Sequence, residues 1–117
     1  MDEVGKQLKK GVLEILILKL LSLQNMYGYQ LIQQLNTGSN GVFSLKEGTL
    51  YPVLYRLEDS GFIENYWEQE TEKRGVPRKY YKITLNGLHE LEKMIHEFST
   101  LVSAVYSILD MEGMKNG

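Results

Sequence analysis

The side chains that most often carry out catalysis are scarce in this chain of 117 residues. It contains no cysteine, and its two histidines, His89 and His96, are seven residues apart. On a helix this spacing separates the two rings by about 10 Å along the axis, too far to share one metal ion. The segment 37–41 (TGSNG) lacks the remainder of a phosphate-binding loop, and no serine lies in a nucleophile elbow. We therefore expect neither an enzyme nor a metal or other cofactor site.

A cluster of basic side chains points to a different chemistry, the binding of phosphates. Five of them lie within ten residues, after a run of glutamates: Lys73, Arg74, Arg78, Lys79 and Lys82. Such a run is compatible with a solvated hairpin and also with an edge that contacts the phosphates of nucleic acid. The net charge of the whole chain is −2, which argues against a histone-like polymer binder. The choice between the two interpretations depends on the elements that carry the cluster.

A second polar group precedes the basic cluster, in the segment 46–58. Its hydroxyls and guanidinium can reach phosphates and base edges; they belong to Thr49, Tyr51, Tyr55 and Arg56. The opposite, apolar side is formed by Leu50, Val53, Leu54 and Leu57. For Tyr51 and Tyr55, ordinary packing with an exposed hydroxyl is an equal alternative. Tyr80 and Tyr81 are adjacent in a predicted strand, so at least one of them faces the core.

Length and composition predict one small domain. Hydrophobic residues make up 43% of the chain and charged residues 24%. The apolar run 12–23 is too short to span a bilayer, which needs about 20 apolar residues, and Glu14 and Lys19 interrupt it. The absence of cysteine fits a reducing compartment, so we expect a cytoplasmic protein. The charge is uneven, at +1 for residues 1–45, zero for 46–82 and −3 for 83–117.

Helical patterns dominate the first half of the chain. Residues 4–24 are predicted to form one helix that is apolar on nearly every side, and residues 27–36 a short second helix, followed by a turn at 37–41. The third helix has two possible starts. Ser44 and Glu47 resemble a capping box, but Pro52 would then lie deep in the helix; with Thr49 as N-cap, Pro52 falls in the first turn. We prefer the start at Thr49, with the helix ending at Gly61.

The second half predicts a β-hairpin and a long helix. Segments 62–69 and 78–84 are rich in aromatic and β-branched residues, and Gly75 and Pro77 lie between them. Thr84 then caps a last helix that runs to about Asp110. The order of helix, helix, helix, hairpin and helix is typical of a winged helix-turn-helix, in which the third helix enters the major groove and the hairpin, or wing, lies along the backbone. The predicted DNA-binding residues are Lys46, Thr49, Tyr51, Tyr55, Arg56, Lys73, Arg74, Arg78 and Lys79.

The last helix carries an apolar heptad repeat over three heptads. The repeat consists of Leu88, Leu91, Ile95, Phe98, Val102, Val105 and Leu109. A helix about 40 Å long is more than a domain of this size can cover, although packing within the domain is the alternative. We expect a homodimer through this helix, with the first helix alongside. The predicted fold is mainly α with a small β-hairpin. Residues 1–84 form the winged helix-turn-helix domain, and 85–117 the dimerisation helix and a short tail.

Four segments resemble the PadR-type transcriptional regulators, in order and spacing over about residues 5–95. They are 11–21 (GVLEILILKLL), 27–31 (YGYQL), 47–58 (EGTLYPVLYRLE) and 78–87 (RKYYKITLNG). The resemblance implies a bacterial homodimeric repressor that binds double-stranded DNA at a palindromic operator and releases it on sensing a small molecule. The single helix after the hairpin is similar to the short members of the family.

The chain departs from the family at one functional position. The multidrug-binding branch has a tryptophan in the last helix, whereas the only tryptophan here is Trp67, in the predicted wing. Phe98 and Tyr106 are the residues that could line a smaller ligand pocket, and dimer packing is their plainer role. The acidic strand 64–70 also keeps open a second function, a winged-helix module that contacts another protein rather than an operator.

Overall fold

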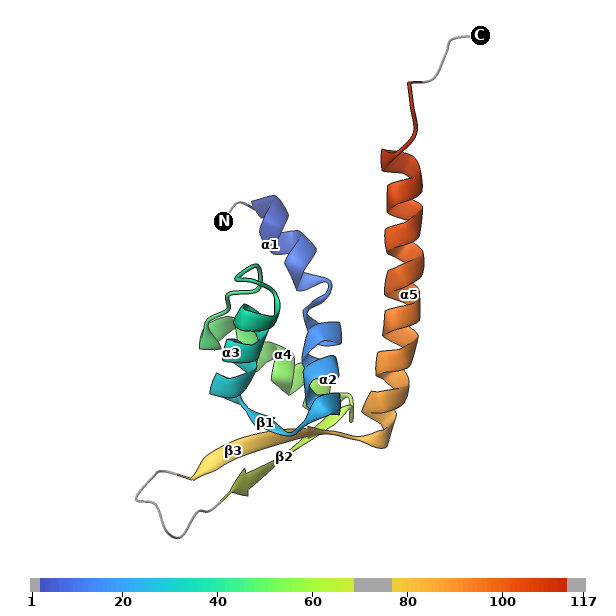
Figure 1. Cartoon of the computed structure of the whole chain (residues 1–117). Helices are drawn as coiled ribbons and strands as arrows, with labels where there is room; N and C mark the ends of the chain where they lie inside the picture. Colours follow the sequence, from blue (N-terminus) through green and yellow to red (C-terminus); the bar gives the residue numbers. More distant parts are fainter. Residues whose placement is uncertain (1–2, 69–76, 114–117) are drawn as a thin grey trace.

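The structure, a computed structural model, describes residues 3–68 and 77–113. Helices α2, α3 and α4 cover one face of a small antiparallel sheet, and α5 begins directly after the C-terminal end of β3 (Figure 1). This arrangement is the predicted winged helix-turn-helix with a long C-terminal helix. In chain order the elements are α1 (Glu3–Lys10), α2 (Leu13–Leu23), β1 (Met26–Tyr27), α3 (Gly28–Gly38), α4 (Glu47–Asp59), β2 (Ile63–Glu68), β3 (Arg78–Ile83) and α5 (Leu85–Leu109).

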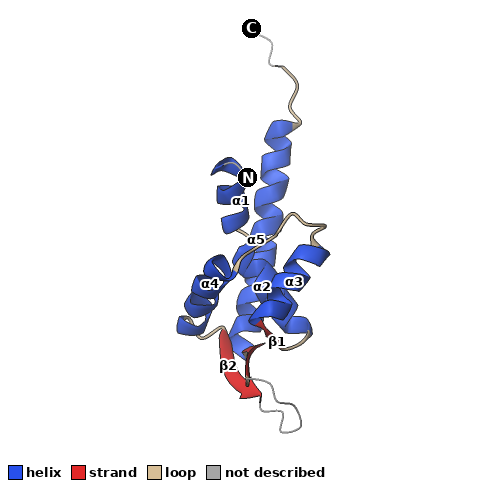
Figure 2. Ribbon diagram, turned by 90° about the vertical axis from the view of Figure 1, so that its left-hand side faces the viewer, coloured by secondary structure: helices blue, strands red, loops and turns tan. Residues whose placement is uncertain are grey.

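The prediction of one continuous helix over residues 4–24 was wrong. The chain forms two helices, and the break falls at Gly11 and Val12. Glycine costs about 1 kcal/mol in a helix interior relative to alanine, and here no packing offsets that cost, since Gly11 is exposed. The break changes the direction of the chain, so α1 and α2 are separate rods in Figure 2.

The second predicted helix is α3, displaced by a residue or two. It begins at Gly28 and continues to Gly38, so only residues 39–41 of the predicted turn (37–41) lie outside the helix. Asn40 and Gly41 there have positive φ angles of 54° and 84°. Asparagine and glycine are the residues that tolerate this region best, which explains why the helix ends here.

The preferred start of the third helix, at Thr49, was wrong. α4 begins at Glu47 with Lys46 as N-cap, and the amides of Thr49 and Leu50 both donate to the Lys46 carbonyl at 3.0 and 3.1 Å. Pro52 is therefore inside the helix and leaves the carbonyl of Gly48 without its helical donor. Gly48 is exposed, so water can satisfy that carbonyl, and this is why the helix tolerates the proline.

The predicted end of α4 at Gly61 is confirmed. Gly61 has a φ of 77°, and its amide donates to Glu58 while the amide of Phe62 donates to Leu57. These two bonds form a Schellman motif, which satisfies the last carbonyls of the helix. The chain then turns directly into β2, so the end of α4 sets where the wing begins.

The predicted hairpin is confirmed, and one strand more is present. β2 and β3 pair in register from Ile63 opposite Ile83 to Glu68 opposite Arg78. The two-residue strand β1 pairs with the other edge of β3, which gives the sheet order β1-β3-β2. β1 is too short to leave a periodic signal in the sequence.

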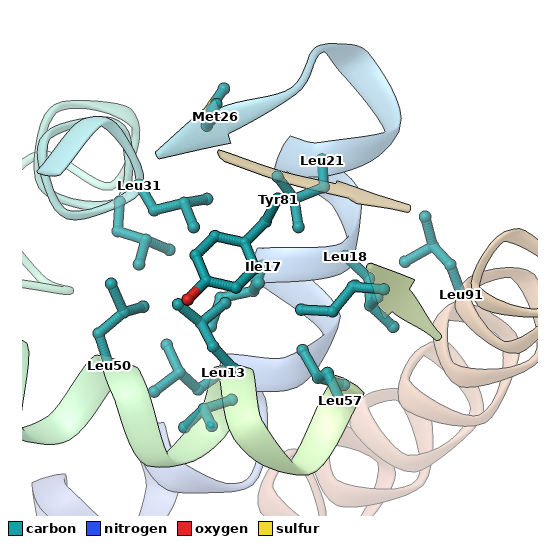
Figure 3. Close-up of a cluster of buried hydrophobic side chains, with 14 residues drawn as sticks. Leu13, Ile17, Leu18, Leu21, Met26, Leu31, Leu50, Leu57, Tyr81 and Leu91 are labelled. Carbon is teal, nitrogen blue, oxygen red and sulfur yellow. The ribbon is translucent and has the colours of Figure 1, made fainter. Parts of the chain in front are cut away.

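The apolar core lies between the helices and the sheet (Figure 3). α2 contributes four of its buried side chains and α4 another four, and Leu91 brings the start of α5 into the same core. Each fully buried leucine or isoleucine contributes about 1.5–3 kcal/mol. The buried hydrophobic residues are Leu13, Ile17, Leu18, Leu21, Met26, Leu31, Leu35, Leu50, Val53, Leu54, Leu57, Ile63, Tyr81 and Leu91.

A tight junction joins the sheet to α5. The Thr84 hydroxyl accepts from the amide of Gly87 at 3.0 Å, which confirms Thr84 as N-cap, and donates to the carbonyl of Gly61 at 2.7 Å. A side chain at Gly87 would collide with the backbone carbonyl of Phe62. Only glycine fits this crossing, so the direction in which α5 leaves the domain is set by backbone packing.

Tyr81 places a hydroxyl in the middle of the apolar core. Its side chain is fully buried, and its hydroxyl, which Figure 3 shows between core side chains of α2, α3 and α4, has no hydrogen-bond partner within the described chain. Burial raises the pKa of this hydroxyl above its ordinary value of 10.0, and the nearby Glu58 adds to the rise. An unpaired buried hydroxyl costs about 1–3 kcal/mol, and the packing of the ring has to offset that cost.

Replacing Tyr81 with phenylalanine should therefore stabilise the protein. We expect the free energy of unfolding of Tyr81→Phe to rise by about 1–2 kcal/mol at neutral pH, measured by urea denaturation. The unfolded tyrosine loses its proton above pH 10 while the folded one keeps it, so wild-type stability falls there by up to about 1.4 kcal/mol per pH unit. The variant should lack this contribution. A less stable variant would show that the hydroxyl has a partner.

Candidate nucleic-acid interface

α4 has one buried side and one open side. Leu50, Val53, Leu54 and Leu57 face the core. At 3.6 residues per turn, the opposite side carries Gly48, Pro52, Tyr55 and Asp59, and all four are exposed. Gly48 and Pro52, the two of these residues in the N-terminal half of α4, have small side chains and no carboxylate. This part of the helix can therefore approach another surface closely.

Three of the predicted DNA-binding residues lie on the open part of α4. Lys46 and Thr49 are exposed at the N-terminal end, and the Tyr55 side chain, two turns further on, is 52% exposed. α4 and its N-cap thus expose an ammonium, an aliphatic hydroxyl and a phenol to solvent. These groups can serve both phosphates and base edges.

Tyr51 is used mainly inside the domain. Its side chain is half-buried, and its hydroxyl lies so close to Gly28 that a side chain at that position would collide with it. Burial raises the pKa of Tyr51, and the charge of Glu47 raises it further. The contact joins α4 to the first residue of α3, so Tyr51 holds the two helices of the helix-turn-helix together. DNA contact by Tyr51 remains a prediction.

Arg56 lies on the side of α4 that faces α2. Its Nε is 3.5 Å from Oε1 of Glu14, and the two side chains are 53% and 32% exposed. An ion pair this exposed is worth about 0–1 kcal/mol, so a phosphate can replace the carboxylate at little cost. Sequence analysis did not find Glu14 as a partner, because the two residues come from helices whose crossing the sequence does not reveal.

The two faces of the wing carry different charges. Side chains alternate along a strand, so Ile63, Asn65 and Trp67 share the helix-covered face of β2, and Glu64 and Glu68 lie on the outer face. The register puts Lys79 on the helix side and Arg78 on the outer face, opposite Glu68. Two further predicted wing residues, Lys73 and Arg74, lie outside the described residues.

Aromatic rings and cations cover the outer face of the sheet. The Tyr80 ring is 5.3 Å from Tyr27 on one side and 5.6 Å from Tyr66 on the other. The Arg78 guanidinium lies over Tyr27 at 4.8 Å, and the Lys82 ammonium over Tyr66 at 6.0 Å. Such contacts contribute about 0.5–1.5 kcal/mol each. They join all three strands at the base of the wing and hold Arg78 away from α4.

Most of the predicted dimerisation residues on α5 are exposed. Leu91 is buried in the core and Val102 is half-buried. The exposed side chains of the repeat are Leu88, Ile95, Phe98, Val105 and Leu109. Figure 1 shows the C-terminal half of α5 standing apart from α2, α3 and α4, so the described residues leave these side chains open to solvent.

Within the described single chain, the structure does not bring Phe98 and Tyr106 together. Both side chains are exposed, and eight residues on a helix separate them by about 12 Å along the axis. The shallow depression on this part of α5 is lined by other residues, including His96, Leu101 and Ala104. The described ranges contain no group of three or more side chains suited to hold a metal ion.

The sequence did not reveal the roles of two residues whose surroundings depend on the tertiary structure. Gly28 looks like an ordinary helix start, and only the approach of Tyr51 shows why it is glycine. Trp67 stands out in the sequence only as a tryptophan outside the last helix, although strand alternation and the hairpin register together assign it to the side of the wing nearest α4. The alternation can be seen in the sequence, but the register cannot.

The fold and the open recognition helix define a winged helix-turn-helix regulator, and comparisons with known proteins agree. The profile of the Transcriptional regulator PadR-like family matches residues 17–93. The chain therefore belongs to this family. No helix in ranges 3–68 and 77–113 has the length and apolar character needed to cross a membrane.

Two solved structures of PadR-type regulators and one curated protein are similar to this chain. A PadR family transcriptional regulator from Eggerthella lenta superimposes with a TM-score of 0.79 at 31% identity, over 91% of this chain and 88% of its own. A PadR-like transcriptional regulator from Bacillus cereus gives 0.77 at 36% identity, over 91% and 99%. A Lysinibacillus sphaericus protein named Uncharacterized protein X is 35% identical over 96% of this chain and 99% of its own length.

Proposed function

We propose that this protein is a homodimeric, sequence-specific DNA-binding repressor without enzymatic activity. α4 enters the major groove through its open face, and the wing lies along the adjacent backbone. The observation that carries the proposal is the open side of α4, with Lys46 and Thr49 exposed at its N-terminal end and Tyr55 further along, followed directly by the β2–β3 hairpin (Figure 1). Arg56 and the predicted wing residues Lys73, Arg74, Arg78 and Lys79 add charges for phosphates. Such a protein works in the cytoplasm, at the nucleoid.

Dimerisation through α5 would place two copies of α4 on one DNA molecule. The exposed apolar stripe of α5 supports it, because a stripe of this length on an isolated helix is costly in water. Two-fold symmetry implies a palindromic operator with half-sites about 34 Å apart. Residues 1–84 then form the DNA-binding unit, whose N-terminal helices also pack in the dimer, and 85–117 the dimerisation unit.

The position of α2 offers a route by which a small molecule would release DNA. α2 packs against α5 on one side and against α3 and α4 on the other. A ligand that changed the crossing of the two α5 helices would move α2, and with it the distance between the recognition helices. Phe98 and Tyr106 are the residues we propose for such a pocket, completed by the partner copy.

The DNA-binding proposal is tested by a gel shift with DNA from around the protein's own gene, at two salt concentrations. Thr49→Ala should relax sequence choice, because the hydroxyl reaches base edges. Neutralising Lys73 or Arg74 should weaken binding to all sequences and lower the salt slope by about 0.9 for each phosphate that the protein no longer neutralises. Lys93→Gln, on α5, removes the same charge away from the interface and should change neither. An absent or salt-insensitive shift would favour a protein-binding module.

Dimerisation is tested by charge substitution in the α5 stripe. Val105→Glu should convert a species of twice 13.5 kDa into a monomer, measured by sedimentation equilibrium, because a buried unpaired carboxylate is costly. Val105 is exposed in the single chain, so the fold itself should survive. Ser107→Glu adds the same charge on the other side of α5 and should remain dimeric. A dimeric Val105→Glu would place the interface elsewhere.

A further inference from the structure

Trp67 is an exposed aromatic side chain that nothing within the domain explains. It is the only tryptophan of the chain, and 60% of its surface is open to solvent, although tryptophan is usually well buried. It occupies the outer part of β2, one residue before the strand ends at Glu68. A large exposed ring in a rigid strand suits contact with another molecule.

The side to which Trp67 points follows from its neighbours on the same face. Ile63 is buried in the core, and the Asn65 amide donates to the Glu58 carboxylate of α4, so this face of β2 is turned towards α4. Trp67 is the next residue on that face, beyond the reach of the helices. Lys79, its cross-strand partner, is on the same side, and its ammonium lies 5.7 Å from the centre of the Tyr81 ring.

The charges of the hairpin are sorted between its faces. On the outer face Glu64 is opposite Lys82 and Glu68 is opposite Arg78, so each acid has a base across from it. The described residues of β2 and β3 place no carboxylate on the helix side, where Trp67 lies beside Lys79. Glu64 and Glu68 are therefore directed away from α4, and the only charged side chain that the described strand residues place on the helix side is Lys79.

We propose that Trp67 and Lys79 form a contact for the sugar-phosphate backbone of DNA, at the edge of the groove that α4 occupies. The indole ring packs on a deoxyribose, and the ammonium pairs with the neighbouring phosphate. This inference rests on the proposed DNA binding and adds a residue to it. The described strand residues on this face include the cation Lys79 and no carboxylate, and the Glu58 carboxylate of α4 that lies against the face is already paired with the Asn65 amide, which favours a polyanion over a protein partner. Contacts to sugar and phosphate contribute to affinity on any sequence.

The single tryptophan allows a direct test by fluorescence. The protein is titrated with two duplexes of equal length, one that is retarded in the gel shift and one of unrelated sequence, with excitation selective for tryptophan. We expect the Trp67 emission to shift to shorter wavelength and change in intensity with both duplexes, as the ring leaves water. High salt should reverse the change along with binding.

Variants separate the ring from the charge. Trp67→Ala should weaken binding to both duplexes by roughly fivefold or more with the salt slope unchanged, and Trp67→Phe should weaken it less. Lys79→Gln should weaken binding to both duplexes and lower the slope of log affinity against log salt concentration by about 0.9. Lys82→Gln is the matched control, since it removes the same charge from the outer face and should leave both quantities unchanged. Circular dichroism checks the fold of each variant.

The outcomes distinguish this inference from the proposed function. If DNA is retarded in the gel but the Trp67 emission and the affinity of Trp67→Ala are unchanged, the Trp67 contact is refuted and the regulator function stands. If no duplex binds to the wild-type protein at low salt, DNA binding itself fails. A loss of affinity with Lys82→Gln equal to that with Lys79→Gln would refute the assignment of the two faces.

Discussion

The structure depends on the burial of α2, an apolar helix that packs against several neighbours. Its core side chains, Leu13, Ile17, Leu18 and Leu21, are nearly inaccessible to solvent, and it contacts α3, α4, β3 and α5. A single neighbour could not cover it, so α4 and the long helix α5 pack on different sides of α2. This packing connects the proposed DNA surface to the proposed dimer surface, because α4 and α5 cannot move independently of α2.

The sheet has a corresponding role on the other side of the core. β3 is its central strand, and the alternation of its side chains sends Tyr81 inward and Tyr80 outward. Inside, the fully buried Tyr81 fills the space between the helices. Outside, Tyr80 lies between the rings of Tyr27 and Tyr66 and so joins the three strands. The wing therefore has a stiff base, and the same alternation gives it an acid-base-balanced outer face and a positive inner face.

Features that arise from neighbours in sequence were predictable. Gly61 ends α4 with a positive φ, Thr84 caps α5, and the hairpin strands carry aromatic and β-branched residues. The family also followed from four segments, since it is these local patterns that build the common core. Where a local rule competes with packing, prediction failed. Gly11 breaks the first helix. α4 begins at Glu47 with Lys46 as N-cap, because a helix can contain Pro52 when the carbonyl that lacks a hydrogen-bond donor is open to water.

By itself, the sequence determined the order of the elements, the ends of several of them, and the apolar repeat of the last helix, because each depends on backbone preferences or on periodicity. The tertiary structure decided which polar groups meet. The pairing of Arg56 with Glu14, the approach of Tyr51 to Gly28, and the separation of Lys79 from Arg78 all depend on crossings and register between distant segments. The arrangement of acidic and basic side chains in residues 46–82 illustrates the difference. In sequence it is a neutral mixture, and in the folded hairpin the described acids lie on one face because side chains of a strand alternate.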